Sequence, residues 1–171
     1  MTAFVALLRA VNVGGRQLAM KDLKSVADDL GLGKARTFIA SGNLLFSSDK
    51  TEEALKRALE RALTDHMGKP VEVMVRTAAE MTAVVAANPF ADEPGNRVVA
   101  IFFDEPPGAG AIESAKNVAD ERLALGKREI YVHYPSGQGR SKLKLGTRAS
   151  GTARNMNSVA RLAELARSID E

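Results

Sequence analysis

The spacing of apolar residues predicts the first two elements of the chain. Residues 4–8 form a short, continuous apolar run, which is typical of a strand buried on both faces and therefore central in its sheet. Apolar residues then recur at helical spacing over residues 20–30. Gly31 marks the end of that helix, because glycine readily takes the left-handed backbone conformation that closes a helix.

A hairpin, a second helix and a further strand are predicted next. Residues 36–40 and 43–47 predict two short strands joined by a tight two-residue turn. Apolar positions over residues 55–63 predict a helix, which a capping-box pattern at residues 49–52 opens. Residues 71–76 alternate between valine and longer or charged side chains, and this alternation predicts a half-buried strand.

The resulting order, β-α-β-β-α-β, is that of a ferredoxin-like unit. We therefore expect an α+β fold in which residues 1–76 form a ferredoxin-like half with an antiparallel sheet. Both helices would cover one face of this sheet, so the other face needs a separate cover. Residues 77–171 predict a second, smaller α/β half packed on the first, and the two halves could form one compact unit.

The second half has a less regular pattern. A capping box at residues 77–80 begins a helix that Asn88-Pro89 ends, and the loop of residues 89–96 is the best candidate for a connection between the halves. Two clear strands are predicted over residues 98–103 and 129–134. The remaining elements are a modest helix over residues 111–118, a possible short strand over residues 142–145 and a final helix that begins within residues 152–157.

Composition excludes several classes of protein. An apolar fraction of 45% over 171 residues is ordinary for a globular chain and too high for a disordered one. The chain has no cysteine, and its two histidines, His66 and His133, are far apart in sequence, so we expect no metal and no cofactor. The N-terminal apolar run is too short for a signal peptide or a membrane span. We therefore expect a cytoplasmic protein with no membrane partner.

The basic residues are concentrated late in the chain. The net charge is only +3, yet residues 130–163 contain no acidic residue, so the rest of the chain is net acidic. Such segregation is typical of an anion-binding surface, although a solvated basic face would show the same pattern. The basic residues of this window are Arg140, Lys142, Lys144, Arg148, Arg154 and Arg161.

The start of the final helix is the strongest candidate for an anion site. Thr152, Asn155 or Asn157 could each cap the helix, because their side-chain oxygens accept hydrogen bonds from the first free N–H groups. Arg154 would add a cation to the positive end of the helix dipole. Met156, Val159, Ala163 and Ala166 would form the buried face of the helix.

Three other segments carry donor groups that suit an anion. The loop after the first strand has a glycine pair with cations and an amide around it, which favours a phosphate or carboxylate cradle and a plain turn about equally. Asn43 follows the hairpin turn, and turn chemistry explains it more simply than a ligand does. The glycine-rich basic segment of residues 135–148 resembles a phosphate-binding loop. The ligand-binding residues that we predict are Arg9, Asn12, Gly14, Gly15, Ser41, Asn43, Ser141, Lys142, Arg154 and Asn155.

Four of these segments together resemble a known bacterial family. They are residues 7–15, 41–46, 139–143 and 152–159, and they occur in the order that the family shows. The chain is similar over essentially its whole length to the family catalogued as domain of unknown function 1697. The resemblance implies an α+β fold with a ferredoxin-like part, and it implies no established activity, substrate or cofactor.

Several functions remain open. The predicted donors favour a binding module, which could also be an enzyme, for a small ligand bearing a phosphate or a carboxylate. A nucleic-acid (RNA) binding protein is the alternative, although aromatic residues are scarce and Phe38 and Phe46 are the only nearby candidates for stacking on bases. We find no catalytic triad, so catalytic residues are unknown, and a lone His133 on a strand is more often packed than catalytic. A structural or oligomer-forming protein without a ligand is the last alternative.

Overall fold

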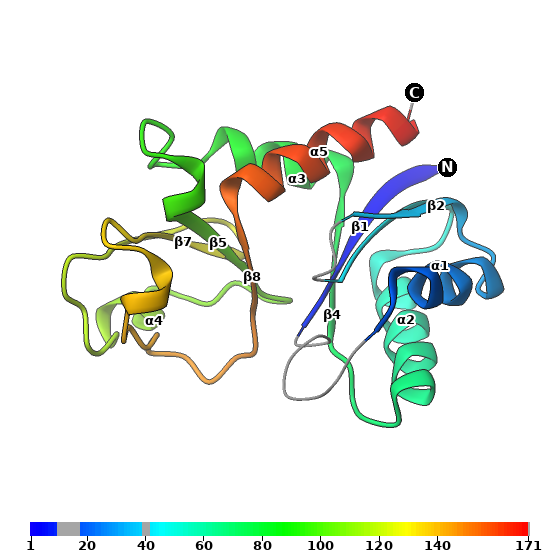
Figure 1. The fold of residues 1–171 in the computed structure, drawn as a ribbon, viewed down its shortest axis with the longest axis horizontal. Helices are drawn as coiled ribbons and strands as arrows, with labels where there is room; N and C mark the ends of the chain where they lie inside the picture. The colour runs from blue at the N-terminus through cyan, green and yellow to red at the C-terminus, as the bar shows by residue number, and fades with distance from the viewer. Residues whose placement is uncertain (10–17, 39–41, 171) are drawn as a thin grey trace. The chain divides into compact units, whose positions relative to one another are not determined.

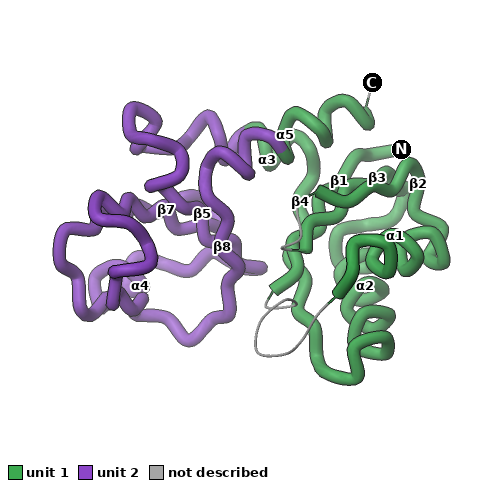
Figure 2. The backbone as a smooth tube through the Cα atoms, in the orientation of Figure 1, with its two compact units in different colours: residues 1–82, 162–171 green, residues 83–161 purple. Residues whose placement is uncertain are grey.

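The chain forms two compact units in a computed structural model. The structure describes residues 1–9, 18–38 and 42–170. One unit comprises residues 1–82 and 162–171, and the other comprises residues 83–161 (Figure 2). We call them unit 1 and unit 2. The fold is α+β, with one four-stranded antiparallel sheet in each unit. None of the described helices is apolar and long enough to span a membrane.

Unit 1 has the predicted β-α-β-β-α-β order (Figure 1). Its sheet has the order β2-β3-β1-β4, so β1 is central, as the continuous apolar run of residues 4–8 predicts. All pairs in the sheet are antiparallel. The elements are β1 (Thr2–Leu8), α1 (Met20–Asp29), β2 (Gly33–Thr37), β3 (Asn43–Ser48), α2 (Glu52–Met67) and β4 (Val73–Thr77).

Helices α1 and α2 pack on one face of this sheet (Figure 1). Leu23 of α1 and Leu59 of α2 join one apolar cluster with Phe4 and Phe46 of the sheet. Thr51, and not Asp49 at the start of the predicted capping box, caps α2, because its Oγ1 accepts a hydrogen bond from the backbone N–H of Ala54 at 3.2 Å. The predicted amphipathic helices are therefore confirmed.

The opposite face of the sheet is also buried. Ala3 and Val5 of β1, which alternate with the helix-facing residues, are both inaccessible to solvent. The end of α5 (Met156–Asp170) belongs to unit 1, and Asp170 Oδ1 accepts a hydrogen bond from the backbone N–H of Ala3 at 2.9 Å. The last turn of α5 therefore lies beside the start of β1.

Strand β4 corrects one prediction. It begins at Val73, two residues later than the alternation suggests, and Met74 and Arg76 are each only 1% exposed. The interpretation as a half-buried strand is therefore wrong. An arginine in an alternating pattern normally marks a solvent face, but Arg76 is buried and its Nη1 donates a hydrogen bond to the carbonyl of Val75 at 3.2 Å.

Helix α3 (Ala78–Ala86) begins with the predicted capping box. The backbone N–H of Thr77 donates to Glu80 Oε1 at 2.9 Å, and the N–H of Glu80 donates to Thr77 Oγ1 at 3.1 Å. Both halves of the reciprocal arrangement are thus formed.

Unit 2 contains the second sheet, with the order β6-β7-β5-β8. One face of this sheet forms an apolar core around Val99, Ile130 and Val132, against which Leu143 and Leu145 pack. The elements of the unit are the short 3-10 helix η1 (Gly95–Arg97), β5 (Val98–Phe102), α4 (Gly110–Glu113), β6 (Arg122–Leu125), β7 (Glu129–His133), the 3-10 helix η2 (Gln138–Arg140) and β8 (Thr152–Asn155).

Two predictions for unit 2 differ from the structure, and one strand was not predicted. The modest helix expected over residues 111–118 is the single turn α4, and within residues 142–145 only Lys144 forms a β-bridge, with Lys116. The final helix begins at Met156, within the predicted range, but Thr152 lies in an unpredicted strand, β8, opposite Phe102 of β5. With only four residues, β8 is too short for an alternating pattern of apolar residues to be recognised. Its pairing with β5 determines its conformation.

Tyr131 joins the other face of this sheet to α3. Its hydroxyl donates a hydrogen bond to the carbonyl of Val84 at 2.6 Å, and the side chain is 1% exposed. Burial, together with the negative charge of Glu129, raises the pKa of Tyr131 to about 12. The neutral phenol is therefore favoured in the folded state.

We expect Tyr131 to make stability pH-dependent above pH 10. A raised folded-state pKa stabilises the fold below the ordinary phenol pKa of about 10, and this contribution is lost as the pH rises towards 12. Tyr131→Phe should cost about 1 kcal/mol at pH 8 through the lost hydrogen bond, and should remove this part of the pH dependence. Urea denaturation of the wild type and of Tyr131→Phe between pH 8 and pH 11 measures how the free energy of unfolding of each protein depends on pH. Parallel stability curves for the two proteins would contradict the prediction.

Candidate ligand-binding pocket

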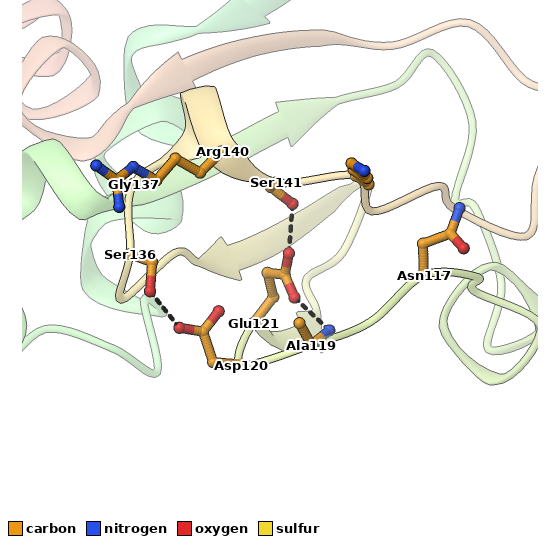
Figure 3. Close-up of a pocket in the computed structure, with 9 residues that line it drawn as sticks. Asn117, Ala119, Asp120, Glu121, Ser136, Gly137, Arg140 and Ser141 are labelled. Atoms are coloured by element: carbon orange, nitrogen blue, oxygen red, sulfur yellow. Dashed lines mark hydrogen bonds between the residues drawn. The ribbon is translucent and has the colours of Figure 1, made fainter.

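Unit 2 contains a pocket of about 310 Å³ next to the start of β6 and the end of β7 (Figure 3). One wall is the segment that leads into β6, and the other is the turn and 3-10 helix that follow β7. The lining residues are Asn117, Ala119, Asp120, Glu121, Ser136, Gly137, Arg140, Ser141 and Lys142.

Local hydrogen bonds fix the wall that follows β7. Gly137 has φ of +89°, which favours glycine, and its N–H donates to the carbonyl of Tyr134 at 3.0 Å. Arg97 Nη1 donates to the carbonyl of Pro135 at 2.9 Å and holds the same turn from outside. The N–H of Ser141 closes η2 by donating to the carbonyl of Gln138 at 3.0 Å. Hydrogen bonds therefore hold the backbone around Ser136 and Ser141 in place.

Two hydroxyl–carboxylate hydrogen bonds connect the walls (Figure 3). Ser136 Oγ donates to Asp120 Oδ2 at 2.5 Å, and Ser141 Oγ donates to Glu121 Oε2. The hydrogen bond from Ser141, and then that from the N–H of Ala119, lower the pKa of Glu121. Glu121 is therefore a carboxylate at neutral pH, with its charge directed at this part of the pocket.

The lining combines both signs of charge. Arg140 and Lys142 are exposed cations of the segment after β7, whereas Asp120 and Glu121 come from the segment before β6. Cations of this kind bind phosphate or carboxylate oxygens, and carboxylates accept hydrogen bonds from hydroxyl or ammonium groups. The pocket can therefore hold a small molecule that carries both an anionic group and a hydrogen-bond donor.

The predicted residues of unit 2 fall into two groups. Ser141 and Lys142 line the pocket, whereas Arg154 and Asn155 are not among its lining residues. Asn155 Oδ1 accepts a hydrogen bond from the N–H of Ser158 at 2.9 Å, so it is the N-cap of α5 among the three candidates.

Arg154 is a buried residue of β8. Its Nη1 donates to Thr152 Oγ1 at 2.7 Å and to the carbonyl of Ala153 at 2.9 Å. Removal from water lowers its pKa to about 10. The guanidinium thus makes hydrogen bonds within its own strand.

The structure describes only some of the ligand-binding residues that were predicted in unit 1. Arg9 is exposed and its Nη1 lies 3.7 Å from Glu72 Oε1. Asn43 is fully buried, and its Nδ2 donates to the carbonyl of Phe38 at 2.9 Å, as turn chemistry predicts. Asn12, Gly14, Gly15 and Ser41 lie outside the described residues. The convergence of these loops with the basic segment stays a prediction.

Sequence reasoning missed the acidic wall of the pocket. Asp120 and Glu121 lie outside the basic window, and nothing in their local pattern indicates that they face Ser136 and Ser141. The consecutive carboxylates directly before the short alternating segment of residues 122–125 are the only signal that could have drawn attention to them.

His133 belongs to a separate polar cluster on the sheet of unit 2. It is 5% exposed, with Nδ1 2.9 Å from Arg122 Nη2 and Nε2 3.5 Å from Glu93 Oε2. Because a guanidinium only donates, Nδ1 accepts and Nε2 carries the proton that faces Glu93. Because His133 is buried and both of its ring nitrogens face polar partners, its environment is that of a structural residue. Within the described ranges, no three His, Asp or Glu side chains are grouped closely enough to hold a metal ion.

Comparisons with known proteins agree with this architecture. The model of the family described as "Protein of unknown function (DUF1697)" matches residues 1–131. A solved structure, described as that of conserved bacterial protein SP0830 from Streptococcus pneumoniae, is similar with a TM-score of 0.79 and 22% sequence identity. The match covers 98% of this chain and 99% of that one, and at this identity it shows the fold alone. The curated proteins include no match.

Proposed function

Since the chain belongs to the family of proteins of unknown function DUF1697, we propose its function from the pocket of unit 2: it binds a small molecule that carries an anionic group and a hydroxyl or ammonium group. The observation that carries this proposal is the pairing of a basic wall with an acidic wall around one cavity. Arg140 and Lys142 would bind the anionic group. Asp120 and Glu121 would accept hydrogen bonds from the donor group.

The size of the pocket supports a small ligand. A volume of about 310 Å³ is at the lower end of the range of ligand pockets, which is roughly 300–1,000 Å³. The lining includes a positive-φ glycine, Gly137, and a positive-φ asparagine, Asn117, with φ of +59°. Such conformations are common in loops that carry binding residues. The proposal retains Ser141 and Lys142 from the residues predicted by sequence.

Binding explains the pocket better than general-base catalysis does. Ser141 and Glu121 have the arrangement of a hydroxyl and its base, but the lowered pKa of Glu121 makes it a weak proton acceptor at neutral pH. Stacking of RNA bases is also disfavoured, since the exposed large hydrophobic side chains of the described residues include no aromatic ring.

We expect O-phosphoethanolamine to bind in this pocket, because it combines a phosphate with an ammonium group. Calorimetric titration should show saturable binding to the wild-type protein and weaker binding of inorganic phosphate and of ethanolamine. The unfolding temperature should rise with probe concentration. The stabilisation should reach about 2.7 kcal/mol when the free probe concentration is about a hundred times Kd. Lys142→Met should raise Kd about tenfold, which corresponds to about 1.4 kcal/mol.

Arg148→Met is the matched control. Arg148 is an exposed cation of the same segment that does not line the pocket, so the variant should keep the wild-type Kd. Absence of saturable O-phosphoethanolamine binding at millimolar concentration, or equal Kd values for the wild type and Lys142→Met, would overturn the proposal.

A further inference from the structure

Lys116 and Lys144 face each other across a two-way backbone bridge. The N–H of Lys116 donates to the carbonyl of Lys144 at 2.8 Å, and the N–H of Lys144 donates to the carbonyl of Lys116 at 2.9 Å. Residues opposite each other in such an antiparallel pair have Cβ atoms about 5 Å apart. The bridge therefore places two ammonium-bearing side chains next to each other.

Both side chains lie on the solvent side of the bridge. Lys142 and Lys144 are exposed, and they alternate with Leu143 and Leu145, which pack against the core of unit 2. Lys116 is exposed as well. Like charges that are directly opposite in an antiparallel pair repel each other, so this arrangement is unfavourable without an anion between them.

Each lysine of the pair is close in sequence to a residue that lines the pocket. Asn117, the next residue after Lys116, lines the pocket, and so does Lys142, which lies two residues before Lys144. None of the ion pairs found in the described part of the chain involves Lys116 or Lys144. Two exposed ammonium groups at the edge of a cationic wall can donate charge-assisted hydrogen bonds to an added anion.

We infer that Lys116 and Lys144 form a second anion subsite, so the ligand of the pocket carries two anionic groups. This inference rests on the proposed function. One anionic group lies against Arg140 and Lys142, the other lies between Lys116 and Lys144, and a hydroxyl or ammonium group faces Asp120 and Glu121. The ligand class is then a small phosphorylated compound with a second phosphate or a carboxylate.

O-phosphoserine and O-phosphoethanolamine test this inference as a matched pair of probes. They share the phosphate and the ammonium group, and only O-phosphoserine has a carboxylate. We expect wild-type protein to bind O-phosphoserine about tenfold more tightly by calorimetry. The double variant Lys116→Gln/Lys144→Gln should lose this preference and keep the wild-type Kd for O-phosphoethanolamine.

Lys127→Gln/Arg148→Gln is the control with the same change in net charge. Lys127 and Arg148 are exposed and lie outside the bridge and the pocket lining, so this variant should keep the preference for O-phosphoserine.

The outcomes separate the second subsite from the pocket itself. Equal affinities of the wild type for the two probes would overturn the second subsite and leave the proposed function standing. Absence of binding of both probes would overturn both. If single-stranded oligouridylate binds more tightly than O-phosphoserine, with a steep salt dependence that is lost in Lys116→Gln/Lys144→Gln, the basic edge is a polyanion surface and the small-ligand subsite is wrong.

Discussion

Phe46→Ala is expected to lower the free energy of unfolding by about 4 kcal/mol. Phe46 is in β3, directly opposite Phe4 of β1, and it is inaccessible to solvent. The two rings are stacked, with centroids 5.7 Å apart, under helices α1 and α2. Removing the ring leaves a cavity that the packed sheet and helices can fill only in part. Urea denaturation followed by circular dichroism measures the loss.

Phe46→Leu provides the control for cavity formation. Leucine keeps most of the apolar volume, so the loss should be about 1 kcal/mol. A loss below about 1 kcal/mol for Phe46→Ala itself would show that the ring does not contribute to this core. The same burial bears on function, because a ring inside the core cannot stack on a base, and Phe46 is one of the two aromatic residues that the sequence offers for RNA binding.

Gly146→Ala is expected to lower the free energy of unfolding by about 3 kcal/mol. A Cβ at this position would lie 2.5 Å from Ser114 Cβ and 2.7 Å from the carbonyl oxygen of Gly110. The second neighbour is backbone, so α4 and the basic segment would have to separate. The hydrogen bond from the N–H of Gly146 to the carbonyl of Ala111, at 2.7 Å, would weaken with them.

Gly139→Ala is the matched control for this substitution. Gly139 lies in the same glycine-rich segment, and a Cβ there would meet no atom within 4 Å. Its stability and its Kd for O-phosphoethanolamine should equal those of the wild type, whereas Gly146→Ala should also weaken the binding of this probe by displacing Lys142. Wild-type stability for Gly146→Ala would mean that the basic segment does not pack on α4 as described.

The fold of unit 1 could be predicted because its signals are local. The apolar run of β1, the helical spacing around Leu23 and Leu59, and the capping residue Thr77 each act within a few neighbouring residues. Such signals can be read directly from the sequence. The burial of Arg76 could not be predicted, because it depends on what covers the second face of the sheet.

The candidate site could be predicted only in part. Ser141 and Lys142 stand out because the basic segment has an unusual local composition, with glycines, hydroxyls and cations together. Asp120 and Glu121 have no such marker. They gain their role from hydrogen bonds with Ser136 and Ser141, which are 16 and 20 residues away along the chain.

The sequence by itself determined the order of strands and helices in unit 1, the capping box of α3 and the place where basic charge accumulates. Periodicity, capping and composition express these properties over short stretches of chain. Only the tertiary structure decided that an acidic segment faces the basic one, that Arg154 is buried in a strand and that Lys116 lies opposite Lys144. Each of these depends on contacts between segments distant in sequence, and the partner of a segment cannot be read from the pattern of that segment alone.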